Sequence, residues 1–166
     1  YAIKDGFYRS FDGSGAAVRN DSYANRSDWE VTWRAGAIVK ASDVVSLRAA
    51  AYTGIRLPTL NELYRPFVVF PVVTNANEDL QPEKLEGYEG GIDFTLDEGT
   101  RFGVTVFDNK VKNAIANVTL APNLRQRRNL DAIDAFGVEF AADVQRGPWG
   151  FNTSLALTDA EVVGTG

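Results

Sequence analysis

Three residue types are missing from this chain, and each absence excludes a class of chemistry. The 166 residues include no cysteine, no histidine and no methionine. Without cysteine there are no disulfides and no thiol catalysis. Without histidine the commonest general base and the commonest metal ligand are absent. We therefore predict no catalytic site, no metal site and no bound cofactor. The lack of methionine indicates a fragment of a longer protein.

Carboxylates remain as candidate catalytic groups, but their spacing does not suit an acid–base pair. Glu89 and Asp93 lie four residues apart on one face of a predicted strand, and Glu139 and Asp143 repeat this spacing. At about 3.3 Å of rise per residue, each pair is separated by more than about 10 Å. Paired glycosidase carboxylates lie closer together. The chain is therefore predicted not to be an enzyme.

Charge and hydropathy exclude two further classes of protein. The net charge of −5 argues against a nucleic-acid partner, because such proteins usually carry a basic patch. No apolar run approaches the length of about 18 residues that a spanning helix requires. No signal peptide is visible. A barrel that crosses a membrane with strands stays possible, because its sequence signal is much weaker.

Alternation of apolar and polar residues with a period of two is the main pattern present. It is clearest over residues 29–40, 136–145 and 149–160. Weaker versions occur over residues 1–9, 44–53, 84–96 and 101–112. These segments predict about seven strands. No segment has the apolar stripe of an amphipathic helix.

The predicted connections alternate between short and long. Residues 41–43, 97–100 and 146–148 form tight turns, whereas residues 10–28, 54–83 and 113–135 form long connections without clear internal structure. An antiparallel up-and-down meander then has its short turns at one end and its long loops at the other. Bacterial outer-membrane barrels show this asymmetry, and soluble domains seldom carry such long unstructured loops.

The side chains divide between the two predicted faces as a barrel wall requires. Aromatic residues fall near both ends of the apolar face: Tyr1, Phe94, Phe102, Trp149 and Phe151 at one end, Phe7, Trp29, Tyr88 and Phe136 at the other. The polar face carries the residues that we predict to line the lumen: Arg34, Arg48, Glu89, Asp93, Glu139 and Asp143. An arginine or lysine in the middle of the lipid face costs about 2–4 kcal/mol. The alternative is a soluble core filled by the aromatic residues.

The connection over residues 54–83 carries the most specific pattern. Its first box is formed by Arg56, Pro58, Glu62, Leu63 and Tyr64. A second box follows with Asn77, Leu80, Pro82 and Glu83, and the next strand contains Glu89, Gly90 and Gly91. These boxes, in this order, resemble those of the TonB-dependent outer-membrane receptor family. Leu57 and Glu78 depart from it, since the family commonly has alanine and proline there. The resemblance covers residues 29–161.

This resemblance implies an all-β fold in which the strands form an arc of a transmembrane barrel of about 22 strands with a plugged lumen. Residues 1–166 are then part of the barrel domain, without the plug domain and the last strands. The resemblance implies a bacterial outer-membrane importer of a scarce nutrient such as a ferric siderophore, haem or cobalamin. Its partners are membrane lipid, the plug, the small-molecule or chelate substrate, and TonB through a segment not in this sequence.

Two groups of candidate site residues follow. Charged or rigid residues at the outer end of a strand are predicted to contact the plug: Arg56, Pro58, Glu62 and Tyr64. The alternative for Arg56 and Glu62 is local capping of the loop. Apolar and basic loop residues are predicted to face the ligand: Arg65, Phe67, Phe70, Arg125, Arg127 and Arg128. For the apolar loop residues the alternative is packing against neighbouring loops. For the run of arginines it is a solvated surface.

Two other architectures fit parts of the pattern. A small self-contained outer-membrane barrel, serving as an adhesin or a porin-like protein, needs about eight strands. Its interior has to be filled by its own side chains, yet many inward positions are glycine, alanine or serine, among them Gly91, Gly137 and Ser154. A soluble carbohydrate-binding β-sandwich is the other alternative, and its edge strands would need protection.

Overall fold

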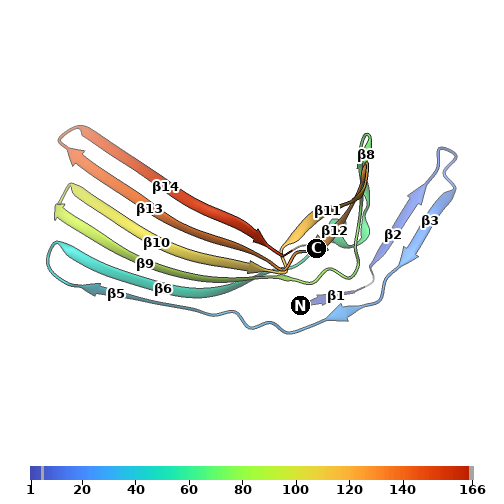
Figure 1. The fold of residues 1–166 in the computed structure, drawn as a ribbon, viewed down its shortest axis with the longest axis horizontal. Coiled ribbons are helices and arrows are strands. Elements are labelled where there is room, and N and C mark those ends of the chain that lie inside the picture. The colour runs from blue at the N-terminus through green and yellow to red at the C-terminus, as the bar shows by residue number, and fades with distance from the viewer. Residues whose placement is uncertain (5, 165–166) are drawn as a thin grey trace.

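The computed structural model describes residues 1–4 and 6–164, and its main element is one curved antiparallel sheet (Figure 1). The strand order is β14-β13-β10-β9-β6-β5. The strands are β5 (Arg34–Lys40), β6 (Val45–Arg56), β9 (Glu83–Asp97), β10 (Thr100–Lys112), β13 (Ala132–Arg146) and β14 (Trp149–Val163). Strands that follow one another through tight turns are neighbours, as the alternation predicted. The sheet forms an open arc, because β5 and β14 each pair on one side only within the described residues.

The prediction of one strand over residues 1–9 is wrong, and the main sheet has six strands instead of about seven. Residues 1–9 are divided between β1 (Ala2–Ile3), which pairs with β4 (Arg26–Ser27), and β2 (Phe7–Phe11), which pairs with β3 (Ala17–Ser22). Just ahead of β2, Gly6 lies against the ring of Tyr64. A side chain at Gly6 would lie 2.9 Å from that ring, so only glycine allows this close approach.

The long connections contain regular structure, which the sequence interpretation missed. Residues 54–83 include α1 (Leu60–Tyr64), β7 (Phe67–Val69) and β8 (Val72–Asn75), and residues 113–135 include β11 (Ile115–Ala121) and β12 (Leu124–Asn129). The four strands form a second sheet, ordered β11-β12-β8-β7, in which β12 and β8 are parallel. We call α1, this second sheet and the segment 76–82 the platform. It stands at the end of the main sheet opposite the tight turns (Figure 1).

The buried core lies in and beside the platform and not between two layers of the main sheet. Leu63, Tyr64 and Leu80 form the core cluster, each with at most 4% of its surface exposed. In the main sheet large apolar side chains such as Leu155 and Phe136 are more than half exposed. No helix in the described part of the chain is long and apolar enough to cross a membrane.

Candidate functional site

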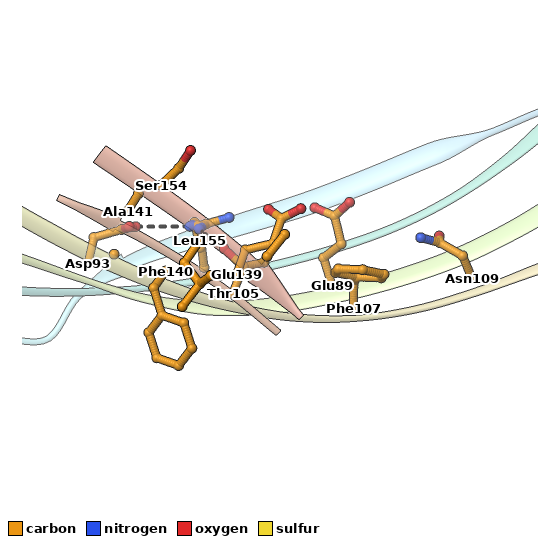
Figure 2. A pocket seen from close by; sticks show the side chains of 13 residues that line it. Glu89, Asp93, Thr105, Phe107, Asn109, Glu139, Phe140, Ala141, Ser154 and Leu155 are labelled. Atoms are coloured by element: carbon orange, nitrogen blue, oxygen red, sulfur yellow. Dashed lines mark hydrogen bonds and ion pairs between the residues drawn. The ribbon is translucent and has the colours of Figure 1, made fainter. Parts of the chain in front are cut away.

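The strand register separates the main sheet into two chemically different faces. Arg34 lies opposite Tyr52, Arg48 opposite Gly91, and Asp143 opposite Asn152. Following these pairs across the sheet places all the predicted lumen-lining residues on one face: Arg34, Arg48, Glu89, Asp93, Glu139 and Asp143. We call it the polar face. Figure 2 shows Glu89 and Glu139 pointing to one side of the sheet and Phe140 to the other.

Long side chains on the polar face bind across several strands. The Arg48 guanidinium on β6 donates to the Asp93 carboxylate on β9 at 3.0 Å and to the Thr105 hydroxyl on β10. It crosses directly over Gly91, where a Cβ atom would lie 2.8 Å from the guanidinium carbon. The sequence placed Arg48 and Asp93 on one face, and the structure brings them into an ion pair.

A second cross-strand contact lies nearer to the platform. The Tyr52 hydroxyl donates to the Glu89 carboxylate at 2.7 Å and lies 3.0 Å from the side-chain oxygen of Asn109. Its ring occupies the space above Gly87, where an added Cβ atom would lie 2.3 Å away. The small residues that the sequence places on this face therefore make room for long side chains of the neighbouring strands.

One carboxylate on the polar face is left free by these contacts. Glu139 makes no hydrogen bond or ion pair within residues 1–4 and 6–164, and it lines a hollow of about 440 Å³ together with Arg48, Glu89 and Ser154. The hollow is an open concavity of the wall that presents both signs of charge. Such a surface suits contact with a complementary polar surface.

The opposite face is apolar and carries aromatic residues near both ends. Tyr88 and Phe136 lie toward the platform, and Phe94, Phe102 and Phe151 lie toward the tight turns. Between them the face presents mainly alanine, valine, leucine and isoleucine, together with Phe140, and Ile92, Phe140 and Leu155 are substantially exposed. Tyr1, Phe7 and Trp29, which the sequence assigned to these aromatic bands, lie outside the main sheet.

Arg56 joins the main sheet to the platform. It ends β6 and forms ion pairs with Glu62 of α1, at 3.1 Å, and with Glu83 of β9. The Glu83 carboxylate also accepts the backbone N–H of Ile115 at 2.7 Å, so the cluster reaches β11. Arg56 and Glu83 together thus connect α1 and β11 to the end of the main sheet that carries the platform.

The first turn of α1 is closed by a capping box. The Thr59 hydroxyl accepts the backbone N–H of Glu62 at 3.2 Å, and the Glu62 carboxylate accepts the backbone N–H of Thr59 at 2.7 Å. Burial alone raises the pKa of the Glu62 carboxyl, but the hydrogen bonds from Thr59 and Arg56 outweigh it and lower the pKa below 4.5.

The other two predicted plug contacts are buried side chains. Pro58 is buried, and Tyr64 is 4% exposed and stacks on Tyr23 with 4.2 Å between the ring centroids. The pairing of Arg56 with Glu62 agrees with the local capping alternative. Contact of these residues with a plug stays a prediction.

The predicted ligand-facing residues differ in their exposure and in their contacts within the chain. Phe70 at the β7–β8 turn is 93% exposed, and Arg65, Phe67, Arg125 and Arg128 are also exposed. Arg127 is already engaged within the platform. Its guanidinium donates to the carbonyl oxygens of Asn61 at 2.5 Å and Arg65 at 3.3 Å, and it lies 5.0 Å from the ring centre of Phe67.

Two residues that hold the platform together were not singled out as site residues. The Asn129 amide donates to the carbonyls of Gln81 and Asn113 and accepts the N–H of Gln81. Arg26 donates to the carbonyls of Glu78 and Leu80 at 2.7 and 3.0 Å. In the sequence, Asn129 could have been noticed only from its position shortly before the clear strand pattern of residues 136–145. Within the described residues no group of three or more acidic side chains is placed to hold a metal ion.

Comparisons with known proteins agree with this geometry. The family described as TonB dependent receptor-like, beta-barrel matches residues 6–166. The chain is 26% identical over 161 residues to the vitamin B12 transporter BtuB of Photobacterium profundum, covering 91% of this chain and 24% of that protein.

Solved structures share the fold. The copper transporter OprC aligns with a TM-score of 0.71 at 21% identity, over 97% of this chain and 25% of that one. The siderophore receptor PirA of Pseudomonas aeruginosa aligns with a TM-score of 0.68 at 20% identity, over 79% of this chain and 28% of that one. The chain spans about a quarter of the length of these relatives. Because the family match covers nearly all of its residues, the chain belongs to the TonB-dependent receptor β-barrel family.

Proposed function

We propose that this chain is part of the wall of a bacterial outer-membrane receptor that actively imports a scarce nutrient and is energised through TonB. The observation that carries the proposal is the division of the six strands into an apolar face and a charged face. A wall between lipid and a plugged lumen requires this division. Ion pairs such as Arg48–Asp93 lie on the charged face, where they avoid the lipid.

The plug domain of the same protein is the proposed partner of the polar face. The free carboxylate of Glu139 and the open hollow beside it suit a polar partner that brings its own hydrogen-bond donors. Arg56 and Glu62 remain proposed plug contacts as well. Their ion pair does not use every hydrogen-bonding position of the two side chains, so the plug can bind the remaining ones.

The proposed substrate is a ferric siderophore, haem or cobalamin. The relatives are transporters and receptors: one is a vitamin B12 transporter, one a siderophore receptor, and one a hemophore receptor of Serratia marcescens solved with its hemophore and heme. The platform offers Phe70, Arg125 and Arg128 as exposed candidates for contact with such a ligand. An enzyme is not proposed.

The two alternative architectures are less well supported. A small closed barrel would pair its first and last strands, whereas β5 and β14 are both open edges in the described sheet. A soluble sandwich would bury one face of the sheet against a second layer. Instead, Phe136 and Leu155 remain 54% and 56% exposed.

Uptake by the full-length receptor tests the proposal. We would delete its gene in the native host and measure accumulation of radiolabelled ferric siderophores, haem and cobalamin, with and without a plasmid copy. At least one substrate is expected to accumulate only with the plasmid copy and only when TonB is present. A receptor that restores uptake equally well without TonB would contradict energised transport.

A further inference from the structure

A cleft lies between the β2–β3 hairpin and the platform, which stand side by side at the same end of the molecule (Figure 1). Its volume is about 530 Å³, which is within the range of small-molecule sites. The polar and aromatic side chains that line it come from two separate parts of the chain: Arg19, Asp21 and Tyr23 from the hairpin side, and Asn75, Glu78 and Gln126 from the platform. A cleft of this size can hold one edge of a nutrient chelate.

The two walls of this cleft are joined through one core. Tyr23, directly after β3, stacks on Tyr64 of α1 with 4.2 Å between the ring centroids. Tyr8 of β2 packs against the same core cluster, and the Arg19 guanidinium lies 5.3 Å from the centre of the Tyr8 ring. Because aromatic packing fixes the hairpin against the platform, the cleft is preformed, and a ligand does not have to order its walls.

Two side-chain amides lie side by side on the platform wall. Asn75 of β8 and Gln126 of β12 are direct partners in the parallel pairing of these strands, so both side chains project from one face of the second sheet into the cleft. Within residues 1–4 and 6–164 the Asn75 side chain makes no hydrogen bond, and Gln126 uses only its oxygen, which accepts from Arg128 at 3.2 Å. The N–H groups of both amides and the Asn75 oxygen are therefore available to a ligand.

The charged residues that line the cleft do not favour an anionic ligand. Among the lining residues that the structure describes, Arg19 is the only cation, and its guanidinium is already paired with Asp21. Glu78 is exposed, and its carboxylate has no hydrogen-bond or ion-pair partner in the described part of the chain. An anionic group in the cleft would therefore meet a like charge at Glu78 without a free cation to compensate it.

The arginines around the cleft are directed elsewhere. Arg125 and Arg127 alternate with Gln126 along β12, so they project from the opposite face of the second sheet. Arg26 donates to two backbone carbonyls of the platform. Arg128 lies on the same face as Gln126 but binds its amide oxygen and does not line the cleft. Hydrogen bonding by amides, and not charge, is the main chemistry that this cleft offers.

We propose that this cleft binds the amide-bearing edge of an uncharged substrate. The proposal rests on the proposed function and selects among its candidate substrates. Asn75 and Gln126 both carry donors, and amides of a ligand supply the matching carbonyl acceptors together with N–H donors for the Asn75 oxygen. The ring edge of a corrinoid such as cobalamin carries carboxamides, and a neutral hydroxamate siderophore on a peptide ring carries peptide amides. Haem and ferric catecholates are anionic, so Glu78 disfavours them.

Calorimetric titration of the full-length receptor in detergent tests the proposal. Two uncharged probes, cyanocobalamin and ferrichrome, are compared with two anionic probes, haemin and ferric enterobactin. At least one uncharged probe is expected to bind. The variant N75L/Q126L should bind it roughly 25-fold more weakly, because each neutral hydrogen bond contributes roughly fivefold to affinity. Asn117→Leu, which removes an amide from the opposite face of the second sheet, should bind as the wild type does.

A second variant separates lost hydrogen bonds from altered packing. N75D/Q126E keeps the shape of both side chains but removes their N–H donors, and should weaken binding of the uncharged probe at least as much as N75L/Q126L. Hydrogen exchange of α1 amides shows whether the platform stays folded in each variant. Binding of an anionic probe alone, or unchanged affinity in both double variants, would overturn the proposal and leave the proposed function intact. Uptake of the bound probe without TonB would instead contradict the proposed function.

Discussion

The main sheet and the platform are parts of one chain that are stabilised in different ways. The sheet has long strands and cross-strand polar contacts such as Arg48–Asp93, but its large apolar side chains are exposed. The platform has short strands and a five-residue helix, yet it buries Leu63 and Leu80 almost completely. The contrast is the one expected for the proposed location, with lipid around the sheet and water around the platform.

The same residue type has different roles in the main sheet and in the platform. Leucine on the apolar face of the sheet is an exposed surface residue, whereas leucine in the platform fills a core. Arginine at position 48 crosses a glycine to bind neighbouring strands, whereas arginine at position 127 binds carbonyls at the end of a helix. Identical substitutions in the two regions therefore separate lipid contact from core packing.

The largest difference is expected for loss of a leucine side chain. Leu80→Ala removes a fully buried side chain packed on Leu63 and Tyr64, and should lower the free energy of local platform opening by about 2–5 kcal/mol. Leu155→Ala leaves no cavity because lipid refills the space, and should cost no more than about 1 kcal/mol. Hydrogen exchange of α1 and β14 amides in the full-length receptor measures both. Similar costs at the two sites would contradict the division into core and lipid face.

Introducing a charge should reverse this order. Leu155→Arg places a cation on the lipid face and is expected to cost about 2–4 kcal/mol. Val68→Arg, at a 62% exposed position of the platform, should change stability by less than about 0.5 kcal/mol. Urea unfolding of the receptor in phospholipid vesicles measures the difference. If both arginines were tolerated equally, the apolar face of β14 would not be in lipid.

These two regions also differ in how well the sequence predicted them. Alternation identified all six strands of the sheet and the face that carries Arg34, Arg48 and Glu139, because a sheet with one apolar and one polar face requires a period of two along every strand. The partner of each charged side chain was not predictable. Contacts such as that of Tyr52 with Glu89 depend on register between segments far apart in sequence.

The platform was largely missed because its signals are local and short. The capping box of Thr59 and Glu62 precedes a single turn of helix, too short for an apolar stripe. The β11–β12 turn uses Asn123 with a positive φ of 63°, a conformation that asparagine tolerates. The parallel pairing of β8 with β12 joins two separate connections, and no pattern within either one predicts it. The motif residues Glu62, Leu63 and Tyr64 were found, although only their contacts show that they build the platform.

Glycine substitutions test the polar contacts of the main sheet. The expected change in the free energy of unfolding is smaller than for the leucine substitutions. Gly87→Ala places a methyl group 2.3 Å from the Tyr52 ring, so the ring has to move and its bond to Glu89 weakens. We expect a loss of about 1–3 kcal/mol in urea unfolding. Gly90→Ala is the matched control on the apolar face, where nothing lies within 4 Å. The account of Gly87 fails if the two substitutions have the same effect, or if Tyr52→Ala does not relieve the cost of Gly87→Ala.

The smallest effect expected is a pH dependence confined to the platform. Because the folded-state pKa of Glu62 is lowered from 4.5, the carboxylate stabilises the platform above pH 4.5. This stabilisation is lost as the pH falls from there through the folded-state pKa. Hydrogen exchange of α1 amides, corrected for intrinsic rates, should show weaker protection below this range, while β10 amides keep theirs. Glu62→Gln should lower protection at neutral pH and weaken the pH dependence of α1, leaving the part that comes from Glu83, the other carboxylate paired with Arg56. A wild-type platform whose protection stays constant down to pH 3 would mean that the contacts of Glu62 with Arg56 and Thr59 do not stabilise it.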